Sequence, residues 1–184
     1  MLKKSALAMA AASVFSAAAI AGKAHVHGLS QLSVVSDGTL LQVEWISPAM
    51  DLVGFEYAAQ GAEEKEIVER AEASLRDHQS IVSIACTHVT TTLDMGDLEG
   101  AHAHDDEHKH VHEDEHAHDE HEESHTDVIA VYEYRCDQGV PRKMSINAFD
   151  VFADVQTFNV EYALLQSQGV AQVTADQRVV TLQP

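Results

Sequence analysis

The sequence is poor in basic residues. Lysine and arginine together number 11, against 30 aspartates and glutamates, and the formal net charge is −19 at pH 7. Binding to nucleic acid phosphates depends on clustered Lys and Arg side chains that release counterions, so this composition excludes a nucleic-acid-binding role. Cations are the partners that such an acidic surface would attract.

Long apolar runs are also absent. The longest, residues 5–20, is shorter than the roughly 18 residues needed to cross a bilayer, so no membrane span is expected. This run follows the basic start MLKK and ends at Ala19-Ile20-Ala21, which is the pattern of a signal peptide. We therefore expect residues 1–21 to be cleaved on export, leaving 22–184 as the mature chain without membrane insertion. Cleavage after Ala24 is the alternative.

Motifs for catalysis are missing as well. The chain has no G-x-S-x-G, no H-E-x-x-H and no phosphate-binding loop, so a non-enzymatic protein is expected. A zinc hydrolase that uses an open coordination position is a weak alternative.

Cysteine is limited to Cys86 and Cys136. An even number of cysteines in an exported protein favours one disulfide, with two free buried thiols as the alternative. The bridge would close a loop of about 50 residues and contribute about 4 kcal/mol to stability by the chain-entropy relation.

The pattern of apolar residues predicts an α+β fold. Asp37-Gly38 lies between two apolar runs and indicates a β-hairpin. Residues 61–77 carry apolar side chains at helical spacing with acidic residues in the first turn, which predicts one long helix. Strands are expected at 25–35, 39–46, 80–92, 127–136 and 158–166, and as a hairpin at 170–174 and 178–182. Together these elements predict a mainly antiparallel β-sheet with the long helix packed on it.

Residues 96–126 have no apolar periodicity, so we expect a disordered His/Asp/Glu-rich loop inserted in a single metal-binding domain, 22–184. Its nine histidines are His102, His104, His108, His110, His112, His116, His118, His121 and His125. Flexible H-x-H units bind borderline divalent ions in many geometries, which predicts several weak, exchangeable sites. The interleaved carboxylates attract cations but also stabilise imidazolium, so this binding should weaken as the pH falls.

A second histidine pair, His25 and His27, lies in the sequence HVHG. On a strand, residues two apart project to the same face, so both imidazoles could point at one ion. A frayed terminus or two solvated edge histidines is the competing interpretation, because two ligands are fewer than the usual three or four. The remaining histidines, His78 and His88, are interpreted as structural.

The sequence resembles the ZrgA-type periplasmic zinc-binding proteins. The resemblance rests on HVHG, the hairpin SDG, the segment SPAMDLVGFE at 47–56 and YEYRC at 132–136, with a His-rich run between the two cysteines. It implies a periplasmic protein that binds Zn2+ and supports zinc uptake, alongside an ABC-type zinc importer or its binding protein. His25 and His27 match the first histidine pair of the family. The family often has a third histidine after GFE, where this chain has Tyr57, so His125 is our candidate for a further ligand.

Zinc is expected because of the resemblance, since flexible imidazole sites alone would favour Cu(II). The alternatives are periplasmic copper or nickel sequestration and a pH-sensing acidic interaction module whose switch is histidine protonation.

Overall fold

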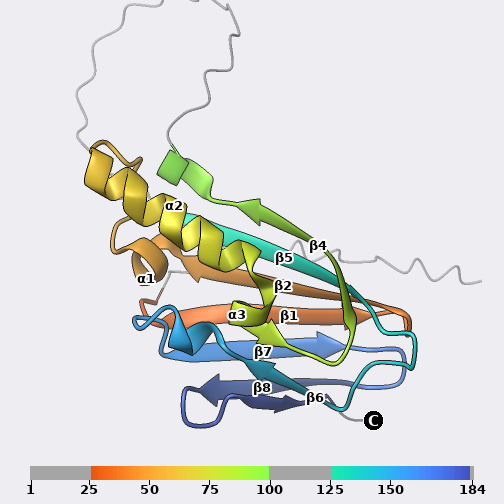
Figure 1. The fold of residues 1–184 in the computed structure, drawn as a ribbon. Coiled ribbons are helices and arrows are strands. Elements are labelled where there is room, and N and C mark those ends of the chain that lie inside the picture. Colours follow the sequence, from red (N-terminus) through yellow and green to blue (C-terminus); the bar gives the residue numbers. More distant parts are fainter. Residues whose placement is uncertain (1–25, 100–125, 183–184) are drawn as a thin grey trace, which may run out of the picture.

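The protein is represented by a computed structural model that describes residues 26–99 and 126–182 (Figure 1). The strands are β1 (Leu29–Ser36), β2 (Leu40–Pro48), β3 (Val82–Ser83), β4 (Thr87–Asp94), β5 (Asp127–Arg135), β6 (Lys143–Ile146), β7 (Thr157–Ala163), β8 (Gln168–Thr174) and β9 (Val179–Thr181). The helices are α1 (Ala49–Val53), α2 (Ala62–Arg76) and α3 (His78–Ile81), with the 3-10 helices η1 (Gly96–Glu99) and η2 (Ala148–Asp150). No helix in the described ranges is long and apolar enough to cross a membrane.

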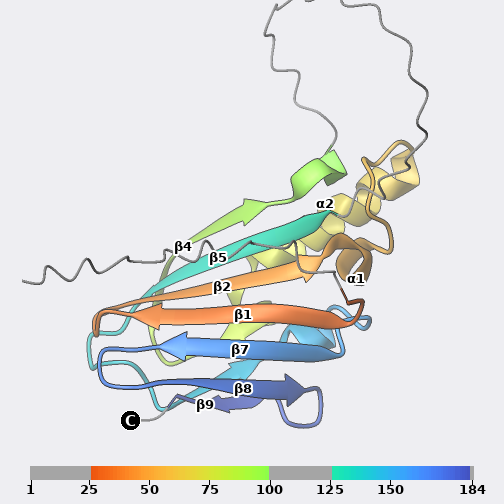
Figure 2. The same cartoon turned by 180° about the vertical axis from the view of Figure 1, so that it is seen from behind.

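Six strands form the large sheet, in the order β4-β5-β2-β1-β7-β8 (Figure 2). All neighbours in it are antiparallel except β1 and β7, which are parallel. The sheet is therefore mixed but mainly antiparallel, and the parallel pair β1–β7 was not predicted. A parallel neighbour 128 residues away, Leu29 opposite Thr157, leaves no local signal because its formation depends on tertiary contacts.

The predicted hairpin is confirmed between β1 and β2. The Asp37 carboxylate accepts hydrogen bonds from the backbone N–H of Thr39, at 3.1 Å, and of Leu40, at 2.9 Å. Gly38 has φ of 109°, a conformation that a residue with a Cβ rarely adopts. The turn thus fixes the register in which every second residue of both strands faces the core.

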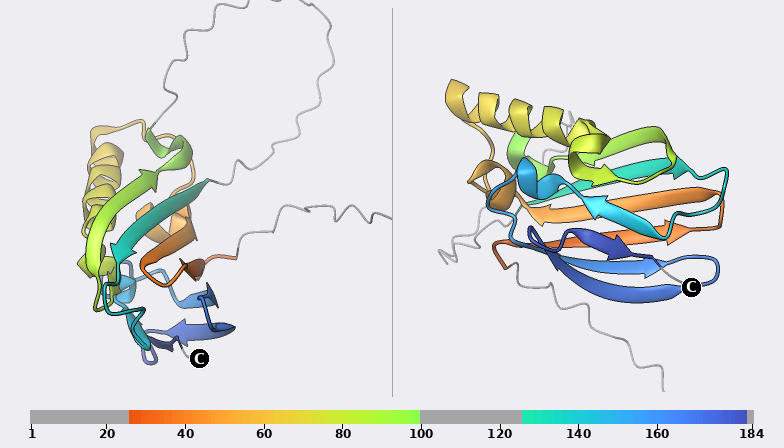
Figure 3. Two further views of the ribbon diagram at one scale, coloured as in Figure 1. Left: turned by 90° about the vertical axis from the view of Figure 1, so that its right-hand side faces the viewer. Right: turned by 60° about the horizontal axis from the view of Figure 1, so that its bottom comes forward.

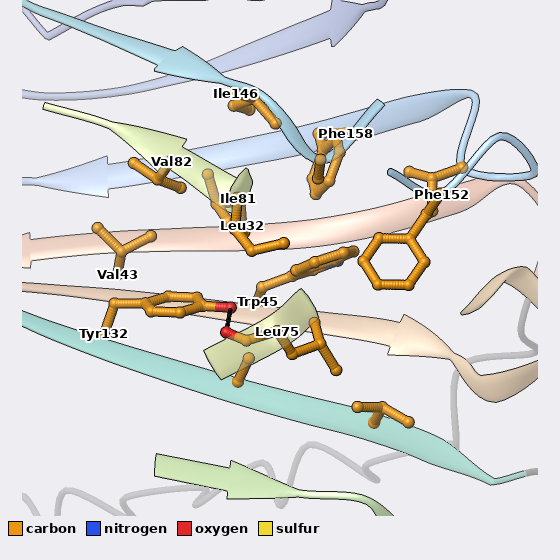
Figure 4. Close-up of a cluster of buried hydrophobic side chains, with 14 of the residues drawn as sticks. Leu32, Val43, Trp45, Leu75, Ile81, Val82, Tyr132, Ile146, Phe152 and Phe158 are labelled. Carbon is orange, nitrogen blue, oxygen red and sulfur yellow. Dashed lines mark hydrogen bonds between the residues drawn. The ribbon is translucent and has the colours of Figure 1, made fainter. Parts of the chain in front are cut away.

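The core lies against one face of the large sheet. Trp45 is at its centre, with ring centroids 5.6 Å from Phe152 and 5.4 Å from Phe158 (Figure 4). Leu32 and Val43 of the same face are also almost fully buried. The opposite face mixes polar and apolar side chains that are exposed or partly exposed, which agrees with a sheet covered on one side.

The expected α+β class is wrong, and the fold is mainly β. Strands make up 44% and helices 24% of the described residues, which contain only one helix of seven or more residues. The three-stranded sheet β3-β6-β9 supplies core-facing residues such as Val82, Met144 and Ile146 over the same face of the large sheet (Figure 3). These strands are two to four residues long, too short to show a recognisable alternation of polar and apolar residues. The sequence therefore predicted only the long helix as the layer that covers the sheet.

The helix predicted at 61–77 is present as α2. Of the residues whose spacing predicted the helix, Val68, Ala71 and Leu75 are buried and Ile67 is partly buried. The Tyr132 hydroxyl of β5 donates a 2.9 Å hydrogen bond to the Leu75 carbonyl. Burial raises the pKa of Tyr132 well above its usual range, so this hydroxyl remains a donor at any physiological pH.

Two further predictions at the ends of strands can be scored. The disulfide between Cys86 and Cys136 is confirmed, with Cα atoms 4.7 Å apart, and it joins the chain before β4 to the chain after β5.

The hairpin predicted around residues 175–176 is wrong, because β8 belongs to the large sheet and β9 to the small one. The turn between them crosses from one layer to the other.

Candidate metal centre

Residues 26–29 form a β-turn, which corrects the prediction that His27 lies on a strand. β1 begins at Leu29, whose N–H donates a 3.0 Å hydrogen bond to the Val26 carbonyl, and Gly28 has φ of 79°, as a type II turn requires. Val26 is 58% exposed and does not share the core with β1 as expected. The turn leaves the His27 side chain 59% exposed beside α1.

A buried carboxylate lies next to this turn. The side chain of Asp51, in α1, is only 2% exposed, and its Oδ2 accepts a 2.8 Å hydrogen bond from the Gly28 N–H. Its other oxygen, Oδ1, is 3.9 Å from Nδ1 of His27. Burial raises the pKa of Asp51, and the nearby carboxylates of Asp154 and Glu56 raise it further, while the Gly28 hydrogen bond and His27 lower it.

The segment that contains Asp51 follows from its sequence. Pro48 precedes the first helical residue of α1, and Gly54 ends the helix with φ of 85°. The sequence predicted a compact turn here that buries Leu52, Val53 and Phe55. Val53 and Phe55 are buried, but Leu52 is only partly buried. A single helical turn instead directs Asp51 inward.

The C-terminal end of the predicted loop meets the same segment. Thr126, which is 4% exposed, accepts a 2.8 Å hydrogen bond from Ala49 N–H through its carbonyl. Its hydroxyl donates to the Glu56 carbonyl at 3.1 Å. The residue that follows the last loop histidine is therefore held between the start of α1 and the chain just after it.

The N-terminal end of the loop is also attached there. The sequence predicted disorder from residue 96, but Gly96–Glu99 forms η1, in which Leu98 is buried and accepts a hydrogen bond from Ala59 N–H at 3.0 Å. Gly96 packs against Thr126 so closely that a Cβ on it would clash with the threonine methyl group. Both described ends of the insertion thus meet the chain at 49–59.

The predicted ligands differ in how far the structure describes them. His27 lies beside Asp51, whereas His25, His125 and the other eight histidines of the insertion lie outside the described residues. Within 26–99 and 126–182, no three His, Cys, Asp or Glu side chains are grouped so that they could hold a metal ion. The ligand set proposed from the sequence therefore stays a prediction.

Sequence reasoning missed Asp51. The segment SPAMDLVGFE was noticed only for its resemblance and its apolar residues, although it contains two acids. An aspartate flanked by Met50 and Leu52 gives no sign of burial, because one residue more or less of helix would place it in solvent. The one available signal was an acidic side chain in an otherwise apolar turn.

His78 and His88 are the other two histidines in the described part of the chain. Their rings stack with centroids 4.0 Å apart, and each packs edge-on against Tyr134. His78 Nδ1 lies 3.4 Å from the Tyr134 hydroxyl, and His88 Nε2 lies 2.9 Å from Thr91 Oγ1. Burial lowers the pKa of His78, and the adjacent His88 lowers it further.

A comparison with known protein families matches residues 24–182 to the ZrgA family of zinc uptake proteins. The chain belongs to the ZrgA family. A search among curated proteins finds no significant match. Membership assigns this ZrgA chain a role in zinc uptake and association with zinc, and the family is not a known enzyme family.

Proposed function

We propose that this ZrgA protein is exported to the periplasm, captures Zn(II) there and supports its uptake by an ABC-type importer. The role in zinc uptake comes from the family. The basic start and the A-x-A site of residues 1–21 support export. In this proposal zinc is the cargo rather than a resident cofactor.

One observation carries the proposed location of the tight site. The turn that holds His27 and both described ends of the His-rich insertion meet the chain at 49–59, through Asp51, Ala49 and Ala59. The candidates His25 and His125 directly precede Val26 and Thr126 in the chain. The Val26 carbonyl accepts a hydrogen bond from Leu29 N–H, and the Thr126 carbonyl accepts one from Ala49 N–H. These positions support a tight site at α1 that combines His25, His27 and His125.

The histidines of the insertion have a different role in the proposal. Each imidazole that binds zinc there must order a stretch of chain with few apolar residues, which uses part of the coordination energy. Weak binding lets zinc leave quickly, and the high local concentration of ligands favours transfer to the tighter site at α1. The insertion is thus proposed to collect zinc, and the α1 site to retain it.

Calorimetric titration of the mature protein with zinc tests both parts. The expected isotherm has a tight class of sites and a weaker class, and deletion of residues 101–124 should remove the weaker class alone. A matched control replaces 101–124 by a Gly/Ser segment of the same length, which keeps the chain connection constant. Loss of all zinc binding in that variant would contradict the two-class proposal, and absence of zinc binding at pH 7 in the intact protein would contradict the function.

Metal preference is tested separately. Imidazole sites follow the order in which Cu(II) binds more tightly than Zn(II) or Ni(II), so affinity alone does not identify the cargo. Growth of a deletion strain under zinc limitation, rescued by the intact protein but not by its His27→Ala variant, would support zinc. Rescue from copper or nickel toxicity instead would favour sequestration.

A further inference from the structure

Asp51 is an unusual residue for its position. It is almost completely buried, yet no lysine or arginine in the described part of the chain pairs with it. Its described partners are the Gly28 N–H and the His27 imidazole. Burial of a carboxylate is costly unless hydrogen bonds or a positive charge compensate, so a buried aspartate with one backbone donor and one histidine is a site where a cation would be favoured.

We propose that Asp51 positions His27 for zinc, with its Oδ1 accepting the Nδ1–H of the imidazole so that Nε2 binds the metal. The proposal rests on the function proposed above and deepens it. A neutral imidazole carries its proton on one nitrogen only, and a carboxylate facing Nδ1 favours the tautomer protonated there. The same contact makes Nε2 a more basic ligand.

The geometry favours this role. The Gly28 N–H holds Oδ2, which leaves Oδ1 directed at His27. The distance of 3.9 Å from Oδ1 to Nδ1 is longer than a hydrogen bond, and apo contacts of this kind commonly tighten when the metal binds. His27 is more than half exposed, so its outer nitrogen is accessible to zinc while its inner nitrogen faces the carboxylate.

Direct coordination by both side chains fits less well. The separation of 3.9 Å between Nδ1 and Oδ1 would have to shorten for either arrangement, so the solvent accessibility of the two groups decides. A metal between them would have to enter a position that is closed to solvent on the Asp51 side. The buried position of the carboxylate therefore suits a hydrogen-bond acceptor better than a ligand.

Zinc affinity of the full-length mature protein tests the proposal, measured by competition with a chelator. The Asp51→Asn variant should weaken the tightest site about 10- to 100-fold, as losses of such outer partners typically do. Asp154→Asn is the matched control, because it removes an exposed carboxylate that acts on Asp51 electrostatically without contacting His27. It should change the affinity less than threefold.

A spectroscopic readout separates positioning from a structural role. Long-range 1H–15N spectra of the zinc-bound protein should show His27 with its proton on Nδ1 and the metal on Nε2, and this needs no variant, so a folding defect in Asp51→Asn does not weaken it. Zinc on Nδ1, or no loss of affinity in Asp51→Asn, would overturn the inference. If His27→Ala also leaves the tightest site unchanged, the proposed location of that site fails instead.

Discussion

The two described histidine environments lie in different parts of the fold and differ in the exposure and the neighbours of their imidazoles. His27 is exposed, sits in a turn and faces a buried carboxylate. His78 and His88 stack on each other and on Tyr134, and one nitrogen of each ring faces a hydroxyl group. The neighbours of a histidine, rather than its abundance, therefore decide whether its imidazole is accessible to ligands or packed against other side chains.

The Cys86–Cys136 disulfide lies close in sequence to His88 and Tyr134 of the stack. Its removal should therefore lower stability without changing zinc affinity. Replacing Cys86 and Cys136 together by alanine should lower the free energy of unfolding by about 4 kcal/mol, because the unfolded chain regains the entropy of its closed loop. Thermal unfolding of the wild type and the double variant measures this loss. Zinc affinity of the variant below its melting temperature should be unchanged, and a large loss of affinity would show that the two regions are coupled.

Exchanging histidine for alanine in each region gives the next largest effect. His27→Ala should weaken the tightest zinc site at least about tenfold, which corresponds to about 1.4 kcal/mol. Its melting temperature should hardly change because the side chain is mostly exposed. His88→Ala, the matched variant in the stack, should show the reverse pattern in the same two assays. Equal effects of both variants on zinc affinity would remove the distinction between the regions.

Gly28 connects the turn to the buried carboxylate of Asp51, so its replacement should lower both the stability of the protein and its zinc affinity. Gly28→Ala should cost about 1–2 kcal/mol of stability, since a Cβ is strained at positive φ, and it would also meet the Gln156 side chain at 3.1 Å. The displaced N–H should weaken zinc binding as well. Gly61→Ala is the control, because a Cβ at Gly61 meets nothing within 4 Å and its φ is negative.

The smallest expected effect is the contribution of the His78–His88 stack to the pH dependence of the protein's stability. The pKa of His78 is lowered in the folded protein by burial and by His88, although Asp77 opposes this. Above the pKa of histidine in the unfolded chain, about 6.5, His78 is protonated in neither the folded nor the unfolded chain. It therefore contributes no pH dependence to stability there. As the pH falls through that value, the unfolded chain takes up a proton that the folded chain resists, so stability decreases. Urea unfolding of wild type and His78→Gln from pH 7.5 to 5 should show a shallower decrease for the variant.

Local chemistry accounts for the elements that were predicted correctly. Asp37-Gly38 forms the hairpin turn, the apolar spacing of α2 produces its buried face, and two cysteines in an exported chain form the bridge. In each case the signal lies within a few residues, or depends on a count alone. The association with zinc, by contrast, came from the family resemblance and is supported by the family match.

The candidate site was predicted only in part. His27 was named, but on a strand, and its partner Asp51 was not recognised, because the contact joins residues 24 apart through a turn and a single helical turn. The His78–His88 stack was likewise invisible, since it forms between α3 and β4 only once β5 places Tyr134 beneath both rings.

Residue types and short-range spacing in the chain thus determine the acidic character, the hairpin, the helix and the disulfide. Tertiary structure decides the mixed strand order, the second small sheet over the core, the burial of Asp51 beside His27 and the stacking of His78 on His88. The physical reason is that turn, helix and ligand preferences are local energies, whereas burial depends on which distant segments exclude water from the same space.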